Sequence, residues 1–194
     1  MEHTTDITAQ GAAAADWHYF FVHSAKIKPT LSRIAADGRF ATFVHTTIRY
    51  SRTKSGVTGK ETPTVGGLVF IQGDLEEILD YMAEKFPSLR LANDCATKRV
   101  ATIPDSVMQP FMRVSAIEPT RVRVLLNPIG CYAQDRQRVR VVSGVLEGME
   151  GYVVRINRDR RLVVAIGDMT LAISGAHNEP LEPVDMPMPN SAKS

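Results

Sequence analysis

The chain has few cysteines, almost no net charge and no long apolar run, and each shortage excludes a class of protein. Its 194 residues include only Cys95 and Cys131, too few for a disulfide framework and without the paired spacing of a zinc site. This predicts a reducing, cytoplasmic environment. The sequence has no run of about 18 apolar residues, the length that would indicate a membrane span. The segment 1–16 carries acids but neither Lys nor Arg, unlike a signal peptide, and is expected to be a flexible leader.

Residues that carry catalysis are also missing. The five histidines (His3, His18, His23, His45 and His177) show no metal-ligand spacing, no Cys–His pair is suggested, and no phosphate-binding glycine loop precedes a helix. We therefore expect neither an enzyme nor a bound metal or cofactor.

The formal net charge is only +2, so an acidic partner must be met by a local patch. Between Ser24 and Lys60 eight basic residues stand against one acid, Asp37. We expect the stretch 52–64 to form a long, mobile hairpin loop. Four basic residues in or beside it either contact nucleic acid through its phosphates or form a solvated hairpin tip: Arg49, Arg52, Lys54 and Lys60.

The first part of the chain alternates predicted strands and helices. Residues 17–22 predict a strand with Trp17, Tyr19 and Phe21 on one face, and 40–51 and 65–73 predict further strands. Helices are expected within 24–38 and over 74–86 and 104–114, with a short strand within 89–103. The apolar stripe of the second helix is Leu75, Ile78, Leu79, Met82 and Phe86. This order is typical of a ferredoxin-like, antiparallel α+β domain.

The last part predicts strands only, over 138–142, 151–156, 161–166 and 169–173, which indicates a small all-β barrel. Gly144 and Gly148 frame a turn, and Gly151 opens a strand where a side chain would crowd its neighbour. The arginines at 155, 158, 160 and 161 either contact RNA or a protein, or supply solvating charge. The Pro-rich tail 178–194 is expected to be extended or disordered.

The stretch "RVRVVSGVLEGMEGYVVRI", followed by "RDRRLVVAI", resembles the KOW motif, an element of SH3-like barrels. It follows a region that begins "WHYFFV" and carries "GGLVFIQ" before an acidic helix. The order resembles the NusG family: NGN domain 17–116, linker with a lead-in strand 117–133, KOW domain 134–177. The wording "GYVVRINRDRRLVVAI" is most similar to the specialised UpxY-type paralogues of Bacteroidetes.

The resemblance implies binding to the β′ clamp helices of RNA polymerase through an apolar patch. The residues that match the family's patch are Tyr19, Phe21, Val65, Leu68, Phe70 and Phe111. On the residues alone, Phe21 and Phe70 fit either this patch or a core, and Trp17 is assigned to the core. The basic loop would approach nucleic acid at the transcription bubble or the nascent RNA. The KOW domain would recruit Rho or a ribosomal protein, although Val145-Leu146 replaces the family's Pro-Phe.

The expected function is transcription antitermination or elongation, on specific long operons such as capsule loci. Two alternatives stay open: a general NusG-type factor, and a KOW-containing RNA-binding protein of the translation machinery. Binding to core RNA polymerase in the absence of RNA separates the last of these from the others.

Overall fold

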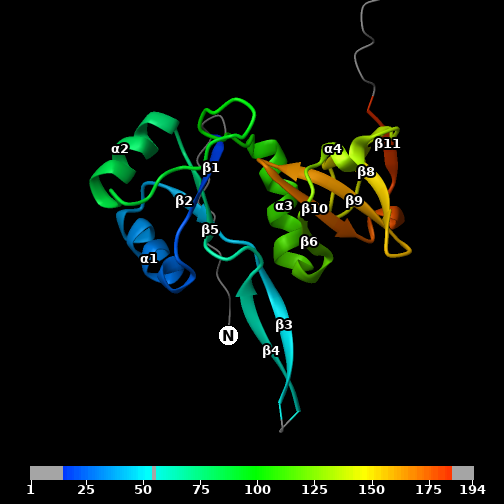
Figure 1. Ribbon diagram of the computed structural model, residues 1–194, viewed down its shortest axis with the longest axis horizontal. Helices are drawn as coiled ribbons and strands as arrows, with labels where there is room; N and C mark the ends of the chain where they lie inside the picture. The colour runs from blue at the N-terminus through cyan, green and yellow to red at the C-terminus, as the bar shows by residue number, and fades with distance from the viewer. Residues whose placement is uncertain (1–14, 54–55, 185–194) are drawn as a thin grey trace, which may run out of the picture.

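The protein has a mixed α/β structure built from antiparallel sheets and helices. The computed structural model describes residues 15–53 and 56–184, and in this part of the chain the strands form three sheets (Figure 1). The first sheet has the order β1-β5-β2, the second is the ribbon β3-β4, and the third has the order β11-β7-β8-β9-β10-β6. The coarse prediction of antiparallel sheets with helices is confirmed.

The three-stranded sheet consists of β1 (Trp17–Phe21), β5 (Leu68–Gln72) and β2 (Ala41–Phe43), with β5 in the middle. Helices α1 (Ile27–Asp37) and α2 (Leu75–Lys85) cover one face, and α3 (Asp105–Ile117) lies on the other (Figure 1). Side chains of β1 alternate as predicted, because Phe20 packs with the α1/α2 cluster while Trp17 and Tyr19 join the opposite cluster. We call residues 17–117 the N-terminal half.

Helix α2 begins where the sequence predicts, since the Asp74 carboxylate accepts hydrogen bonds from the N–H groups of Glu76 and Glu77 at 2.9 and 3.2 Å. One member of its predicted apolar stripe is wrong: Leu79 is 42% exposed. Tyr81 is buried instead, with its hydroxyl donating to Asp37 at 2.7 Å. Burial and this hydrogen bond raise the pKa of Tyr81 to about 12.

The stretch predicted as a mobile loop is a strand. Residues 40–51 divide into β2 and β3 (Thr46–Thr53), and β3 pairs along its length with β4 (Gly56–Pro63). The threonines and valine of this stretch suit a strand, so only 54–55 separate the two strands; these two residues lie outside the described part. The ribbon projects from the body of the molecule (Figure 1). The short strand predicted within 89–103 is reduced to isolated bridges, such as Phe20 to Leu91.

The six-stranded sheet, which we call the C-terminal sheet, contains the four predicted strands at nearly the predicted bounds. They are β7 (Arg138–Val141), β8 (Glu150–Ile156), β9 (Asp159–Ile166) and β10 (Met169–Ser174). The linker, predicted to carry a lead-in strand, contains β6 (Val122–Leu125), which pairs with β10, and the short helix α4 (Gly130–Ala133). The tail, predicted to be extended or disordered, contains β11 (Leu181–Pro183), which pairs with β7.

The three glycines singled out in the sequence have the structural roles predicted for them. Gly144 and Gly148, in the turn between β7 and β8, have φ of 96° and 83°. Residues with a side chain rarely adopt such positive φ angles. A Cβ on Gly151 would lie 2.3 Å from the carbonyl oxygen of Val163. Glycine is therefore required there by the close approach of β8 to β9.

The C-terminal sheet and the N-terminal half share one apolar cluster, which contains Trp17 and Phe70 from one side and Leu162 and Leu171 from the other. The two halves are therefore packed against each other. No helix in the described ranges is long and apolar enough to cross a membrane.

Candidate protein-binding face

The residues predicted to bind a partner meet on the face of the three-stranded sheet opposite α1 and α2. Tyr19, Phe70 and Phe111 come from β1, β5 and α3, and the Tyr19–Phe70 and Phe70–Phe111 ring centroids lie 6.0 and 6.1 Å apart. Val65 and Leu68 line a small cavity together with Phe70 and Phe111. Five predicted residues far apart in sequence are thus neighbours. We call these five, with Phe43, the apolar face.

Phe43 was missed in the sequence, although it packs with both Phe70 and Phe111 at 5.9 and 5.6 Å between ring centroids. Its cross-strand partner is Phe70, and opposite residues of paired strands share a face. The signal was available only once the pairing of β2 with β5 was known.

The apolar face is covered by the chain itself. Tyr19, Leu68, Phe70 and Phe111 are all buried, and of the six predicted residues only Phe21, 53% exposed, is largely open to solvent. Val124 of β6 and Met169 and Leu171 of β10 complete the cavity of about 10 Å³ over this face. In this structure the C-terminal sheet therefore occupies the face, and these residues are not open to a partner.

Few polar contacts cross between the halves near this face. Asp168, in the β9–β10 turn, accepts a hydrogen bond from the backbone N–H of Cys95 at 3.1 Å, and Arg113 of α3 donates to the carbonyl of Glu147. Burial raises the pKa of Tyr19, and the negative charge of Asp168 raises it further. A hydrogen bond to Asp168 likewise raises the pKa of the exposed Cys95 thiol. Asp168 is therefore the polar centre of the contact.

Two polar side chains are buried beside the apolar face without hydrogen-bond partners: both ring nitrogens of His45 and the hydroxyl of Thr64. Both residues line the cavity, and the His45 ring lies 5.3 Å from that of Phe111. Burial lowers the pKa of His45 to about 4, so the imidazole is neutral at pH 7. Unpaired buried groups weaken the packing around them.

The predicted basic residues Arg49, Arg52 and Lys60 lie on the β3–β4 ribbon, and Lys54 lies outside the described residues. Arg49 and Lys60 stand directly opposite each other, on the face that Thr47 and Thr62 share. The other face carries the exposed side chains of Ile48, Tyr50 and Val57. Arg52, the cross-strand partner of Val57, lies on this second face as well. Basic side chains therefore stand on both faces of the ribbon, and the exposed apolar ones on one.

Metal chemistry has no site in the described residues: no group of three His, Cys, Asp or Glu side chains is close enough to hold an ion. His18 is engaged with the Ala101 carbonyl oxygen at 3.0 Å.

A scan against protein-family models finds no match, and no curated protein matches by sequence. Among solved structures, the chain is similar to one described as "Domain interaction in Thermotoga maritima NusG", with a TM-score of 0.42 and 15% identity, over 88% of this chain and 97% of that one. A similarity at this level does not define a family, so the function below is argued from the sequence motifs and the geometry.

Proposed function

We propose that this protein is a NusG-type transcription factor that binds RNA polymerase through the apolar face and promotes processive transcription. The observation that carries the proposal is the convergence of Tyr19, Phe70 and Phe111 on one face, with ring centroids about 6 Å apart. These positions were assigned to polymerase binding from the sequence resemblance alone. The order of the two halves also agrees with an NGN domain followed by a KOW domain.

The partner that suits this face is an amphipathic helix, such as the β′ clamp helices. The face is lined by aromatic and aliphatic side chains from β1, β2, β5 and α3. An apolar surface of this kind binds mainly through buried area, about 25 cal/mol per Å². Because Val124 and Leu171 cover it in the structure, the halves must separate before a helix can bind. Partner binding therefore competes with packing of the C-terminal sheet.

We assign nucleic-acid contact to Arg49, Arg52 and Lys60 of the ribbon. These side chains form no ion pair in the described part of the chain, and the ribbon projects from the body of the molecule (Figure 1). Contacts of such residues to phosphates give salt-sensitive affinity. The proposed targets are the transcription bubble and the nascent RNA.

The C-terminal sheet offers less to a second partner at the turn that the family uses. Leu146, at the position of the family's Phe, is fully buried in the shared apolar cluster. An interaction with Rho or a ribosomal protein at this turn would therefore also require the halves to separate.

The direct experiment measures binding of the full chain to purified core RNA polymerase without any RNA. Phe21→Ala removes an exposed side chain whose ring centroid lies 6.1 Å from that of Tyr19, so it should weaken binding while the fold is retained. Tyr50→Ala removes an aromatic side chain that is even more exposed, at 69%, from the ribbon and is the control. Binding that appears only with RNA, or equal losses in both variants, would contradict the proposal and favour an RNA-binding protein of the translation machinery.

A transcript profile of a deletion strain tests the finer part of the proposal. We expect loss of distal transcription in one long operon, such as a capsule locus. A change across many operons would instead identify a general NusG-type factor.

A further inference from the structure

The hairpin between β8 and β9 ends in an unusual residue. Its two-residue turn consists of Asn157 and Arg158, with φ of 50° and 68°. Two-residue hairpins with positive φ at both positions favour Asn or Asp first and Gly second. Arg158 therefore stands where glycine would be accommodated without steric cost.

A second unfavourable choice lies directly beside this turn. Arg155 of β8 is the cross-strand partner of Arg160 of β9, and like charges placed opposite each other repel. Both side chains are exposed, as is Arg158. The adjacent acid does not relieve the repulsion: Asp159 lies on the opposite face of the hairpin, where it accepts a hydrogen bond from Arg161 at 3.2 Å.

None of the three arginines forms an ion pair within the ranges that the structure describes. By contrast, Arg138 and Arg140 of the neighbouring strand β7 both pair with Glu150. Two locally unfavourable choices and three unpaired guanidinium groups thus coincide at one hairpin tip. Such breaks in local consistency are expected where a sequence serves a function.

We propose that Arg155, Arg158 and Arg160 form a binding site for the phosphodiester backbone of nucleic acid. Guanidinium groups bind phosphate oxygens through paired hydrogen bonds, and a bound phosphate chain would neutralise the repulsion between Arg155 and Arg160. None of the exposed large apolar side chains lies on β8 or β9, so the tip lacks the apolar anchor that a protein interface needs. Without a stacking side chain, the site binds without sequence preference.

This site is separate from the β3–β4 ribbon and does not depend on polymerase binding. The ribbon also places basic residues opposite each other, Arg49 and Lys60, but it carries exposed Tyr50 and Val57 besides. The β8–β9 tip presents charge alone.

The test measures fluorescence anisotropy of a labelled single-stranded RNA and of a duplex DNA of equal length with the full chain, over a series of salt concentrations. The triple variant Arg155→Thr, Arg158→Gly, Arg160→Thr keeps strand-forming residues in the strands and suits the turn. If each arginine meets one phosphate, single-strand affinity should fall about 100-fold near 0.1 M salt, and the salt slope should decrease by about 2. The probe that binds with the higher affinity, RNA or duplex DNA, identifies the kind of nucleic acid that the site prefers.

The control variant Lys26→Gln, Lys28→Gln, Arg99→Gln removes the same charge from exposed positions elsewhere and should leave affinity within about twofold. Equal losses in both variants, or no loss in the first, would overturn the proposal. So would arginine-dependent binding of polyglutamate as tight as that of RNA, which would indicate an acidic protein partner. Arg155→Lys with Arg160→Lys keeps the charge and the fold, and should bind RNA with intermediate affinity because paired hydrogen bonds are lost.

Discussion

The backbone N–H of Cys95 donates a hydrogen bond to the carboxylate of Asp168 at 3.1 Å, and this contact joins a loop of the N-terminal half to the β9–β10 turn. The residue before Asp168 explains how the turn comes so close. A Cβ on Gly167, which has a φ of 58°, would lie 2.9 Å from the Tyr19 ring. Gly167 lets the turn approach the Tyr19 ring, and Asp168 accepts the hydrogen bond from Cys95. Together they hold the C-terminal sheet at the edge of the apolar face.

Gly167→Ala is expected to weaken the packing between the halves. Its methyl group would meet the ring of Tyr19, which is 3% exposed and packs against Phe70, and overpacking of this kind costs about 1–3 kcal/mol. We expect a lower free energy of unfolding, measured in urea, and stronger binding to core RNA polymerase, because the apolar face is freed.

The control is Gly148→Ala, which also places a side chain at positive φ, here 83°, but with no atom within 4 Å of the new Cβ. It carries the backbone strain without the contact to Tyr19. The explanation fails if both variants bind polymerase equally well.

The sequence predicted much of the apolar face but not its cover. The family resemblance named Tyr19, Leu68 and Phe70, and these residues share one apolar cluster because side chains of a strand alternate between faces. No periodic pattern reports that Leu171 packs against Phe70, because this contact joins segments about a hundred residues apart. Phe43 was missed for the same reason, since it needs the pairing of β2 with β5.

The prediction of a loop over 52–64 was wrong because the local composition favours a loop, whereas pairing between strands decides the structure. Glycines and charged residues in 52–64 indicate a loop, whereas eight residue pairs between β3 and β4 hold this stretch as a strand. The polar network around Arg121 was invisible in the sequence, because its partners Ser174 and Glu179 lie 53 and 58 residues further along the chain.

His45 predicts a loss of stability in acid. Its pKa is lowered to about 4 in the folded protein by burial, against about 6.5 when unfolded. The unfolded chain therefore binds the proton more readily, so the contribution is complete above pH 6.5 and decreases as pH falls toward 4. Between pH 7.5 and 5.0 this group alone should lower the free energy of unfolding by about 2 kcal/mol.

Urea unfolding of the wild type and His45→Leu at the two pH values measures this contribution. The variant should lose less stability on acidification, and it should be more stable at pH 7.5 because two unpaired buried nitrogens are removed. An unchanged pH dependence in His45→Leu would contradict the assignment.

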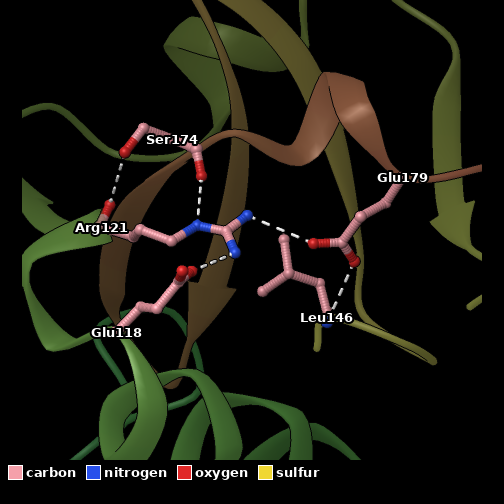
Figure 2. A network of polar contacts seen from close by, with 5 residues as sticks. All are labelled: Glu118, Arg121, Leu146, Ser174 and Glu179. Carbon is pink, nitrogen blue, oxygen red and sulfur yellow. Dashed lines mark hydrogen bonds and ion pairs between the residues drawn. The ribbon is translucent and has the colours of Figure 1, made fainter. Parts of the chain in front are cut away.

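Arg121 should contribute more to stability than Arg140, although each pairs with two glutamates. The Arg121 and Glu179 side chains are 18% and 13% exposed, and Glu179 also accepts the N–H of Leu146 at 3.1 Å (Figure 2). Arg121→Met leaves a nearly buried carboxylate without its cation, which should cost about 2–3 kcal/mol. Arg140 is 46% exposed, so Arg140→Met should cost less than about 1 kcal/mol. Equal losses in urea unfolding would show that burial of the pair is unimportant.

Substitution of Gly151 tests whether the close approach of β8 to β9 depends on the absence of a side chain at this position. A Cβ there would lie 2.3 Å from the Val163 carbonyl oxygen and 2.8 Å from a Val164 methyl group; because the first is a backbone atom, β8 and β9 would have to move apart. Gly151→Ala should therefore cost about 2–3 kcal/mol, whereas Gly130→Ala, with no atom within 4 Å, should be neutral or slightly stabilising. Val164 belongs to the same apolar cluster as Leu171 and Phe70, so displacement of β9 should also loosen the cover of the apolar face. Faster amide exchange at Leu68 and Phe70 in Gly151→Ala than in Gly130→Ala would report that loosening; identical exchange in the two variants would show that the strain stays within the sheet.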